Sequence, residues 1–504
     1  MTIGEALPGV TLTFVPRGSQ EEPLRTDVAA FLGRTRRGPL GVPVRGESWN
    51  DVVGTFGQPD GSSATPYALR GFFENGGRTA WVIRVSGPAE TASAQWLQYQ
   101  VIASSPGAWA NGGRVAIRFQ ASTLAGPPTV SVRVTVPGEP AETFAGIPPS
   151  EVVTRLATSR LIRLVPVEQA PPPAPARRDE RPRPGGPPIS TLAEGSDSSG
   201  AISRSWDLIL AGGSDVAPGQ AEYSAAVQAQ ADLPEPALVA LPDLGADLTG
   251  ETRGELAREL MLTALTSLDR LVVLDVPPDK SSVDEAVKWT ESLGDKKLLS
   301  TAAAYHPALE VPGTPGARTV PASGHVLGVI ARLDAERGAH HTPANAVILE
   351  AVDLAVEFPE PQQVRLFEAG INLVRCTRGR GLLVWGGRTL SNGFIAHRRL
   401  VHLLVRAIRR VAGPLVFDVN SPELRLTLVR ALTSVLLAAF RAGALAGSRA
   451  EQAFRVTCDE SNNPPEQDPG QVVCEIEVAP AAPMEFIRLR LVLGQDRDLE
   501  VIEA

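Results

Sequence analysis

The sequence has little cysteine and no long uninterrupted apolar run. Its 504 residues include three cysteines, Cys376, Cys458 and Cys474, which do not make a disulfide framework. The most apolar long stretch, Ala431–Gly447, is interrupted by Arg441 and is too short to span a bilayer. The first residues also lack the basic and apolar regions of a signal peptide. A reducing cytoplasm is therefore the expected compartment, and no direct membrane insertion is expected.

An excess of basic charge is also absent. The 48 lysines and arginines are outnumbered by 56 aspartates and glutamates, for a formal net charge of −8. This balance argues against a general nucleic-acid-binding protein. With 43% hydrophobic and 21% charged residues, the composition is that of a soluble globular protein. The length predicts about three domains instead of a single core.

Motifs that carry catalysis or hold cofactors are missing as well. The sequence has no Walker A run, no HExxH and no GxSxG. Gly379 and Gly381 begin a dinucleotide-type fingerprint, but Val384 stands where the third glycine belongs. His340 and His341 fit no standard zinc spacing. We therefore expect no cofactor and no metal. Cys458 and Cys474 could meet across adjacent strands, and buried free thiols are the favoured interpretation.

Two carboxylates leave a catalytic alternative open. Asp243 ends an apolar run in ALVALPDL, and Asp275 ends another in LVVLDVPPD. Enzymes with α/β folds often place catalytic carboxylates at the ends of parallel strands. An aspartate in this position also commonly caps the next loop or pairs with an arginine. Because no nucleophile, phosphate loop or metal set accompanies them, we expect a protein that is not an enzyme and keep an α/β enzyme as the alternative.

The order of predicted elements indicates a mixed α/β fold. The chain opens with a strand at Val28–Gly33, two short helices, and a strand at Ala80–Val85 that follows the turn residues Gly76 and Gly77. From Gln100 to about residue 165 short strands dominate. Strands and helices then alternate in a βαβαβ pattern, at Ala237–Leu241, Gly254–Ser267, Arg270–Asp275, Val283–Leu293 and Leu298–Tyr305.

A proline-rich stretch separates the second and third of these regions. Residues 166–188 contain nine prolines and several arginines, and a Ser/Gly-rich run follows to residue 200. Such a composition cannot bury enough apolar surface to order itself, so it predicts a flexible linker or surface loop.

Two helices and two terminal strands stand out as candidate contact elements. The helix at Ala396–Val411 has an apolar stripe, and its other faces carry Arg398, Arg406, Arg409 and Arg410. It suits an acidic partner surface or a solvated face equally well, and a membrane less well. A second long helix is predicted at Pro422–Gly443. Strands are predicted at Val10–Val15 and Phe486–Leu493, and a lone terminal strand must pair with some other strand, such as one of another chain.

Several segments along the chain, in the same order, resemble the contractile tail sheath proteins of phage tails and phage-tail-like injection systems. They include RGFFENGGRTAWVIRV (Arg70–Val85), LVVLDVPPD (Leu271–Asp279), VPASGHVLGVIARLDAERGAHHTPAN (Val320–Asn345), GINLVRCTRGRGLLVWGGRTL (Gly370–Leu390) and EIEVAPAAPMEFIRLRL (Glu475–Leu491).

This resemblance implies a discontinuous protein with two arms. The N-terminal arm is residues 1–25, and the C-terminal strand and arm are residues 486–504. An inner, tube-facing domain is expected from residues 26–90 and 346–485. The outer domain is expected from residues 91–165 and 201–345, separated by the insert 166–200. Ala80–Val85 is expected to complete an inner sheet with C-terminal segments. The side chains expected to mediate strand addition between subunits are Val10, Leu12, Phe14, Phe486, Ile487, Leu489 and Leu491.

The resemblance further implies stacked six-membered rings around an inner tube, which contract to drive the tube through a target envelope. The expected partners are copies of the same chain, the inner tube protein, and baseplate and cap proteins, but no nucleic acid. Arg398, Arg406, Arg409 and Arg410 are the candidate tube-facing residues. Assembly is expected in the cytoplasm, with the product forming part of a virion or of a released extracellular particle. A cap or baseplate component of the same particle is the related alternative.

Overall fold

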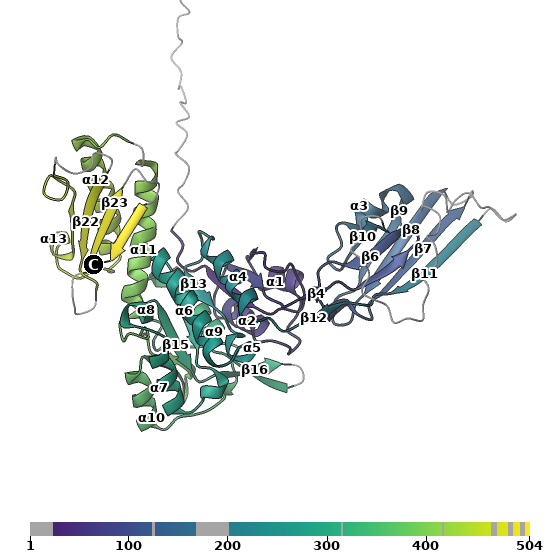
Figure 1. Cartoon of the computed structure of the whole chain (residues 1–504), viewed down its shortest axis with the longest axis horizontal. Coiled ribbons are helices and arrows are strands. Elements are labelled where there is room, and N and C mark those ends of the chain that lie inside the picture. Colours follow the sequence, from purple (N-terminus) through teal and green to yellow (C-terminus); the bar gives the residue numbers. More distant parts are fainter. Residues whose placement is uncertain are drawn as a thin grey trace, which may run out of the picture.

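The computed structural model describes residues 24–122, 126–167, 201–313, 316–415, 418–464, 471–481, 487–493 and 499–503. The described chain is elongated, with a central α/β body, a β body at one end and a C-terminal unit at the other (Figure 1). The mixed α/β class predicted from the sequence is confirmed.

The central body is built on one eight-stranded sheet. Its strand order is β2-β3-β1-β13-β14-β15-β19-β20, with a parallel interior and an antiparallel strand at each edge. The interior strands are short apolar runs buried on both faces, as parallel strands covered by helices must be. The strands are β1 (Ala29–Gly33), β2 (Val44–Gly46), β3 (Ala80–Arg84), β13 (Leu238–Ala240), β14 (Leu271–Asp275), β15 (Ala302–His306), β19 (Ile371–Thr377) and β20 (Gly381–Trp385).

Helices cover both faces of this sheet, because successive strand residues point to opposite sides. On β1, Phe31 joins one apolar cluster and Leu32 joins the other. Helices α1 (Trp49–Phe56), α2 (Thr65–Glu74) and α9 (Ser323–Arg337) pack on the Phe31 side. The Leu32 side is covered by α4 (Gln220–Ala231), α6 (Gly250–Ser267), α7 (Val283–Ser292) and α10 (Glu360–Glu368). Shorter elements complete the body: α5 (Leu244–Asp247), α8 (Lys296–Leu299), β16 (Leu309–Gly313), β17 (Gly316–Val320) and β18 (Asp353–Leu354).

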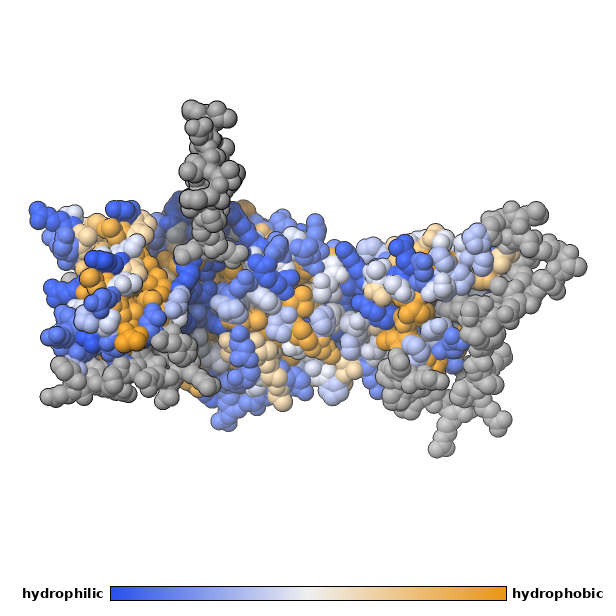
Figure 2. All heavy atoms as spheres, turned by 90° about the horizontal axis from the view of Figure 1, so that it is seen from above, coloured by the Kyte–Doolittle hydropathy of each residue, from blue (hydrophilic) through white to orange (hydrophobic). Residues whose placement is uncertain are grey.

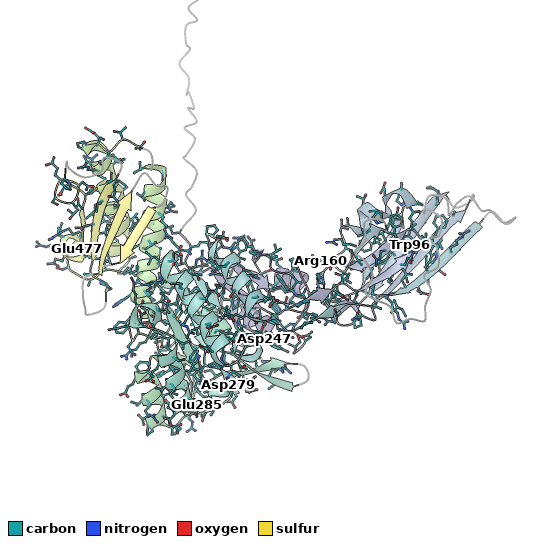
Figure 3. The ribbon with its side chains drawn as sticks, viewed as in Figure 1. Trp96, Arg160, Asp247, Asp279, Glu285 and Glu477 are labelled. Atoms are coloured by element: carbon teal, nitrogen blue, oxygen red, sulfur yellow. The ribbon has the colours of Figure 1, made fainter. Side chains whose placement is uncertain are left out.

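The β body packs two antiparallel sheets around a core that contains Trp96 and Phe119. Figure 3 labels Trp96 in this body, away from the central sheet. The short pair β4 (Ala89–Glu90) and β12 (Ser214–Asp215) connects it to the central body. Its elements are β5 (Ser93–Trp96), β6 (Tyr99–Ala103), β7 (Arg114–Ser122), β8 (Gly126–Thr135), β9 (Glu142–Ile147), α3 (Val152–Leu156), β10 (Ile162–Pro166) and β11 (Ala201–Ile209).

The C-terminal unit packs two long helices on an antiparallel sheet of order β21-β22-β23-β24. Leu404 and Leu428 of the helices and Ile476 of the sheet belong to one buried cluster. Helix α11 also runs back to the central body (Figure 1). The elements are α11 (Ile395–Ala412), α12 (Pro422–Arg441), α13 (Ala450–Ala453), β21 (Phe454–Thr457), β22 (Val472–Val478), β23 (Ile487–Leu493) and β24 (Leu499–Glu503).

The central sheet crosses the division expected from the sequence. Strands β1 and β3, expected in the inner domain, share this sheet with β13, β14 and β15, expected in the outer domain. Strand β3 pairs with β1 and β2, and the same sheet contains β19 and β20, which lie nearly 300 residues later in the sequence. The described residues of 400–481 lie instead in the C-terminal unit. The reason is that a parallel strand needs a partner on each side and helices on both faces. Segment 217–306 supplies β13 beside β1 and the helices α4 and α6 on its Leu32 side, while α2 and α9 cover its Phe31 side.

Helices α2 and α9 approach each other closely through glycine. A Cβ atom at Gly328 would lie 2.4 Å from the carbonyl oxygen of Phe72, and one at Gly324 would lie 2.3 Å from that of Ala68. Both obstacles are backbone atoms of α2, which cannot rotate away as a flexible side chain can. The glycine spacing in GHVLG therefore sets the distance between the two helices that cover one face of the sheet.

We predict that Gly328→Ala lowers the free energy of unfolding by about 3 kcal/mol, because the added methyl group must push the helices apart. Gly254→Ala, inside helix α6, is the matched control. A Cβ at Gly254 would meet only the end of the flexible Arg258 side chain, at 3.3 Å or more. This substitution should be neutral or stabilise by about 0.4–1 kcal/mol. Urea denaturation followed by circular dichroism measures both, and equal effects of the two substitutions would refute the packing argument.

Candidate functional site

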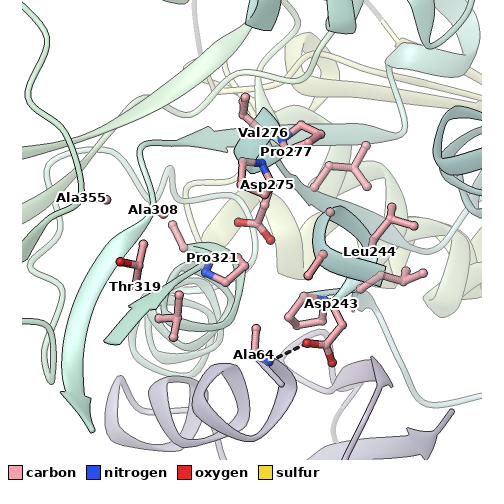
Figure 4. Close-up of a pocket in the computed structure, with 18 of the residues that line it drawn as sticks. Ala64, Asp243, Leu244, Asp275, Val276, Pro277, Ala308, Thr319, Pro321 and Ala355 are labelled. Atoms are coloured by element: carbon pink, nitrogen blue, oxygen red, sulfur yellow. Dashed lines mark hydrogen bonds between the residues drawn. The ribbon is translucent and has the colours of Figure 1, made fainter. Parts of the chain in front are cut away.

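The two carboxylates predicted at strand ends lie at one cavity. A cavity of about 680 Å³ opens at the carboxyl ends of β13 and β14 and is lined by both Asp243 and Asp275 (Figure 4). The connection from β1 leads to β3 on one side, and that from β13 leads to β14 on the other. In open α/β sheets this switch point is where ligands bind. The two aspartates, predicted from the sequence to end parallel strands, thus lie where an α/β enzyme would bind its ligand.

Asp243 is occupied with holding the start of helix α2. Its carboxylate accepts hydrogen bonds from the backbone N–H groups of Arg34 (2.9 Å) and Ala64 (2.5 Å), and from the Thr65 hydroxyl (2.6 Å). Burial raises the pKa of Asp243, and these hydrogen bonds oppose the rise. A helix N-terminus is a natural anion site. Here the chain fills it with its own carboxylate.

Asp275 holds the start of helix α9 in a similar way. It accepts a hydrogen bond of 2.8 Å from the backbone N–H of Ser323, the first residue of α9. Burial raises the pKa of Asp275 to about 7, against the hydrogen bonds from Ser323 and Ala322. Figure 4 shows its carboxylate separate from that of Asp243 and directed toward Pro321. The two groups thus hold different helices and do not act on a common point.

The rest of the cavity is largely apolar. Tyr305 and His306 line it, and burial lowers the pKa of His306 to about 4, so the imidazole is neutral at pH 7. The buried Arg253 also lines the cavity and forms an ion pair of 2.6 Å with Asp279, a residue that Figure 3 labels. Among the described residues no group of three or more His, Cys, Asp or Glu is arranged to hold a metal ion. The cavity has the shape of a ligand crevice, but its carboxylates serve as helix caps.

The opposite edge of the sheet holds the arginines of α11. Arg406 was a candidate tube-facing residue, but its side chain is only 9% exposed. Its guanidinium donates hydrogen bonds to the carbonyl oxygens of Arg25 (2.9 Å), Glu235 (2.8 Å) and Pro236 (2.6 Å), and lies 3.5 Å from Asp269. These residues precede β1, β13 and β14. Arg406 thus joins α11 to the amino ends of three neighbouring strands.

The other candidate arginines divide between this contact and the surface. Arg409 donates to the carbonyl oxygen of Ser267 (2.7 Å) and pairs with Asp269 at 3.3 Å, so it also faces the central body. Arg398 is buried, with 6% of its surface exposed. Arg410 is exposed. Of the four, Arg410 alone has the exposure that a direct contact with another protein requires.

Sequence reasoning missed the most buried ion pair of this contact. Arg399 of α11 pairs with Asp334 of α9, and the two side chains are 2% and 4% exposed. Arg399 also donates to the carbonyl oxygen of Thr26 (2.7 Å), while the Thr26 hydroxyl donates to Asp334 (2.9 Å). A signal was present in the sequence, because positions 399, 402, 406 and 409 form one basic stripe at helical spacing. We name Arg399, Arg406 and Arg409 with their acceptors the α11 joint.

The predicted arms are only partly described. Val10, Leu12, Phe14 and Phe486 lie outside the described residues. The predicted C-terminal strand is present as β23, the strand that contains Ile487, Leu489 and Leu491. It pairs with β22 and β24 of the same chain. Its part in contacts between subunits remains a prediction.

We predict that Asp275 makes stability depend on pH. The pKa of Asp275 rises from 3.8 to about 7 on folding. The free energy of unfolding that this shift contributes is therefore fully present below pH 3.8 and is lost as the pH rises through 7. Asp275→Asn keeps an acceptor for the Ser323 N–H but cannot ionise. The urea midpoint of the parent protein should therefore fall relative to that of Asp275→Asn between pH 5 and pH 8. Exposed Asp207→Asn is the control, and parallel profiles for parent and Asp275→Asn would contradict the assignment.

Comparison with known proteins gives a consistent result. Residues 217–390 match the family model of the phage tail sheath protein central domain. The chain is 30% identical over 184 residues to the tail sheath protein of Vibrio phage KVP40, a match covering 35% of this chain and 26% of that relative. The chain thus spans about a quarter of this curated relative.

Solved structures extend the likeness to the whole fold. The sheath tail protein of Desulfitobacterium hafniense superposes with a TM-score of 0.61 at 15% identity, covering 96% of this chain and all of that one. The helical sheath of the anti-feeding prophage in its contracted state gives a TM-score of 0.55 at 19% identity, over 96% of this chain and 98% of the other. The resemblance predicted from the sequence is confirmed: residues 217–390 match the phage tail sheath protein central domain, and the chain has the fold of sheath proteins.

Proposed function

We propose that this chain is a subunit of a contractile sheath in a phage tail or a phage-tail-like injection system. The observation that carries the proposal is the tail sheath central domain at residues 217–390. The likeness to a contracted helical sheath over 96% of the chain supports it. In this proposal subunits stack as six-membered rings around an inner tube, assemble in the cytoplasm, and contract to drive the tube through an envelope. Copies of the chain, the tube protein, and baseplate and cap proteins are its partners.

Contraction requires no catalytic site in the chain. The crevice carboxylates Asp243 and Asp275 are engaged as helix caps, which supports a mechanical role for the central body. The driving free energy would then come from new interfaces formed as the rings rotate. Terminal arms that add strands to neighbouring subunits would keep the rings connected, since each backbone hydrogen bond contributes about 0.5–1.5 kcal/mol net.

The outer face of α12 is the better candidate for contact with the tube. The basic residues of α11 lie mostly within the α11 joint, whereas α12 exposes Arg430 and Arg441 together with Leu426, which is 49% exposed. Figure 2 shows apolar surface on the C-terminal unit, at the end of the molecule away from the β body. Arginine is enriched at protein interfaces, and an exposed apolar side chain such as Leu426 offers surface that a partner can bury. We therefore assign the tube contact to α12.

The proposed function predicts that the chain polymerises. The purified full-length chain, alone or with its tube protein, should form long helical tubes visible by negative-stain electron microscopy. A chain that remains a small soluble oligomer under all conditions would refute the sheath assignment. A variant lacking residues 1–18 should keep its circular dichroism spectrum but lose the tubes. Unimpaired tubes from this variant would refute the arm proposal alone.

A separate prediction tests the contact between α12 and the tube. Reversing charge at Arg430→Glu with Arg441→Glu should reduce the amount of co-purified tube protein about tenfold or more, because each glutamate would face the acidic groups that the arginines contact. The same change at two exposed arginines of the β body, Arg118→Glu with Arg133→Glu, alters net charge equally and should leave co-purification unchanged. Equal loss in both variants, or in neither, would remove α12 as the tube contact.

A further inference from the structure

Two cysteines face each other in the C-terminal unit. Cys474 lies in β22 and Cys458 directly follows β21, and both are buried, at 0% and 7% exposure. The antiparallel register pairs Val456 with Ile476 and Thr457 with Glu475. Continued by one residue, this register places Cys458 directly opposite Cys474. Both side chains belong to the same apolar cluster.

The hydrogen-bond pattern brings the two side chains close together. The N–H of Ala479 donates to the carbonyl oxygen of Ala453 at 2.8 Å, which marks that pair as hydrogen-bonded. Because such pairs alternate with non-hydrogen-bonded ones, Cys458 and Cys474 form a non-hydrogen-bonded pair. Cα atoms in such pairs are about 4.5 Å apart, within the range of about 4.4–6.8 Å that a disulfide spans.

The next position of the ladder is completed by a side chain. Asn463 donates from Nδ2 to the carbonyl oxygen of Val473 (2.8 Å) and accepts the N–H of Val473 at Oδ1 (2.6 Å). The amide thus takes the place of a strand residue opposite Val473. This arrangement holds β22 in register beyond the end of β21, so the cysteine pair lies in an ordered part of the sheet.

The surroundings favour Cys458 as the reactive thiol. The contact with Cys474 lowers the pKa of Cys458, and the Arg425 guanidinium acts in the same direction, against the effect of burial. The same contact together with burial raises the pKa of Cys474. Cys458 is also the more exposed of the two, and it follows an edge strand of only four residues. A small opening of β21 would therefore expose Cys458 first.

We propose that Cys458 and Cys474 are a thiol–disulfide site that closes in an oxidising environment. The co-reactant is a low-molecular-weight disulfide of the glutathione class. The Cys458 thiolate attacks one sulfur of this disulfide and releases one thiolate, leaving a mixed disulfide. Cys474 loses its proton and attacks the Cys458 sulfur, forming the bond between the two cysteines and releasing the second thiol. Two protein thiols are oxidised and one disulfide is reduced to two thiols.

The bond would fasten the edge strand β21 to β22, in the same sheet as β23 and β24. In a reducing cytoplasm the pair stays open, and after transfer to an oxidising exterior it closes. The proposal concerns the folded chain alone and does not depend on the sheath assignment, so either can fail without the other.

The test uses the full-length chain with Cys376→Ser, which removes the exposed thiol. The protein is equilibrated in glutathione buffers of rising oxidised fraction, at a temperature just below its Tm so that β21 can open. Titration of thiols after denaturation should fall from two to none, and peptide mapping should find Cys458 joined to Cys474. The oxidised form should melt about 5 °C or more above the reduced form.

The control is Cys376→Ser with Cys458→Ser, which keeps only the Cys474 thiol. Oxidised glutathione can form no more than a mixed disulfide with this thiol, and the Tm of the variant should not change. Two free thiols persisting in the most oxidising buffer would overturn the proposal. So would a bond found between two chains, or an oxidised form that melts no higher than the reduced form.

Discussion

The α11 joint determines how the C-terminal unit is held to the central body. The amino ends of parallel strands leave carbonyl oxygens that need donors, and guanidinium groups supply several donors each. Arg406 serves the segments before β1 and β13, Arg409 serves the segment before β14, and Arg399 closes on Asp334. Burying so many charges is costly unless each is paired and hydrogen-bonded. The position of the C-terminal unit therefore depends on the loops that precede three strands of the central sheet.

The two edges of the central sheet have different tasks. At the carboxyl edge, where α/β enzymes bind ligands, Asp243 and Asp275 hold the starts of α2 and α9. At the amino edge, the arginines of α11 attach the C-terminal unit. Side chains at the strand ends thus hold helix starts at one edge of this sheet and attach the C-terminal unit at the other, and such side chains, more than the fold, decide what a sheet of this kind does.

Sequence patterns captured what depends on neighbouring residues. The strands at β1, β3 and β14 were predicted because each is a short apolar run bounded by turn or charged residues. The expected strand at Leu298–Tyr305 begins only at Ala302, because Asp295 accepts the N–H of Leu298 at 2.8 Å and starts α8 instead. The stripe on α11 was visible in its spacing. Its partners, Asp269 and Glu235, lie more than a hundred residues away, and no local pattern reveals that they would cover it.

The root of the N-terminal segment also belongs to the α11 joint. The carbonyl oxygens of Arg25 and Thr26 receive hydrogen bonds from Arg406 and Arg399, on the helix that carries the C-terminal sheet. Residues 25 and 26 are thereby fixed to a helix that lies nearly 400 positions later in the sequence. A load pulling on the start of the chain would pass directly into α11 and the sheet of the chain's other end, loading several donors at once, and would bypass the β body entirely.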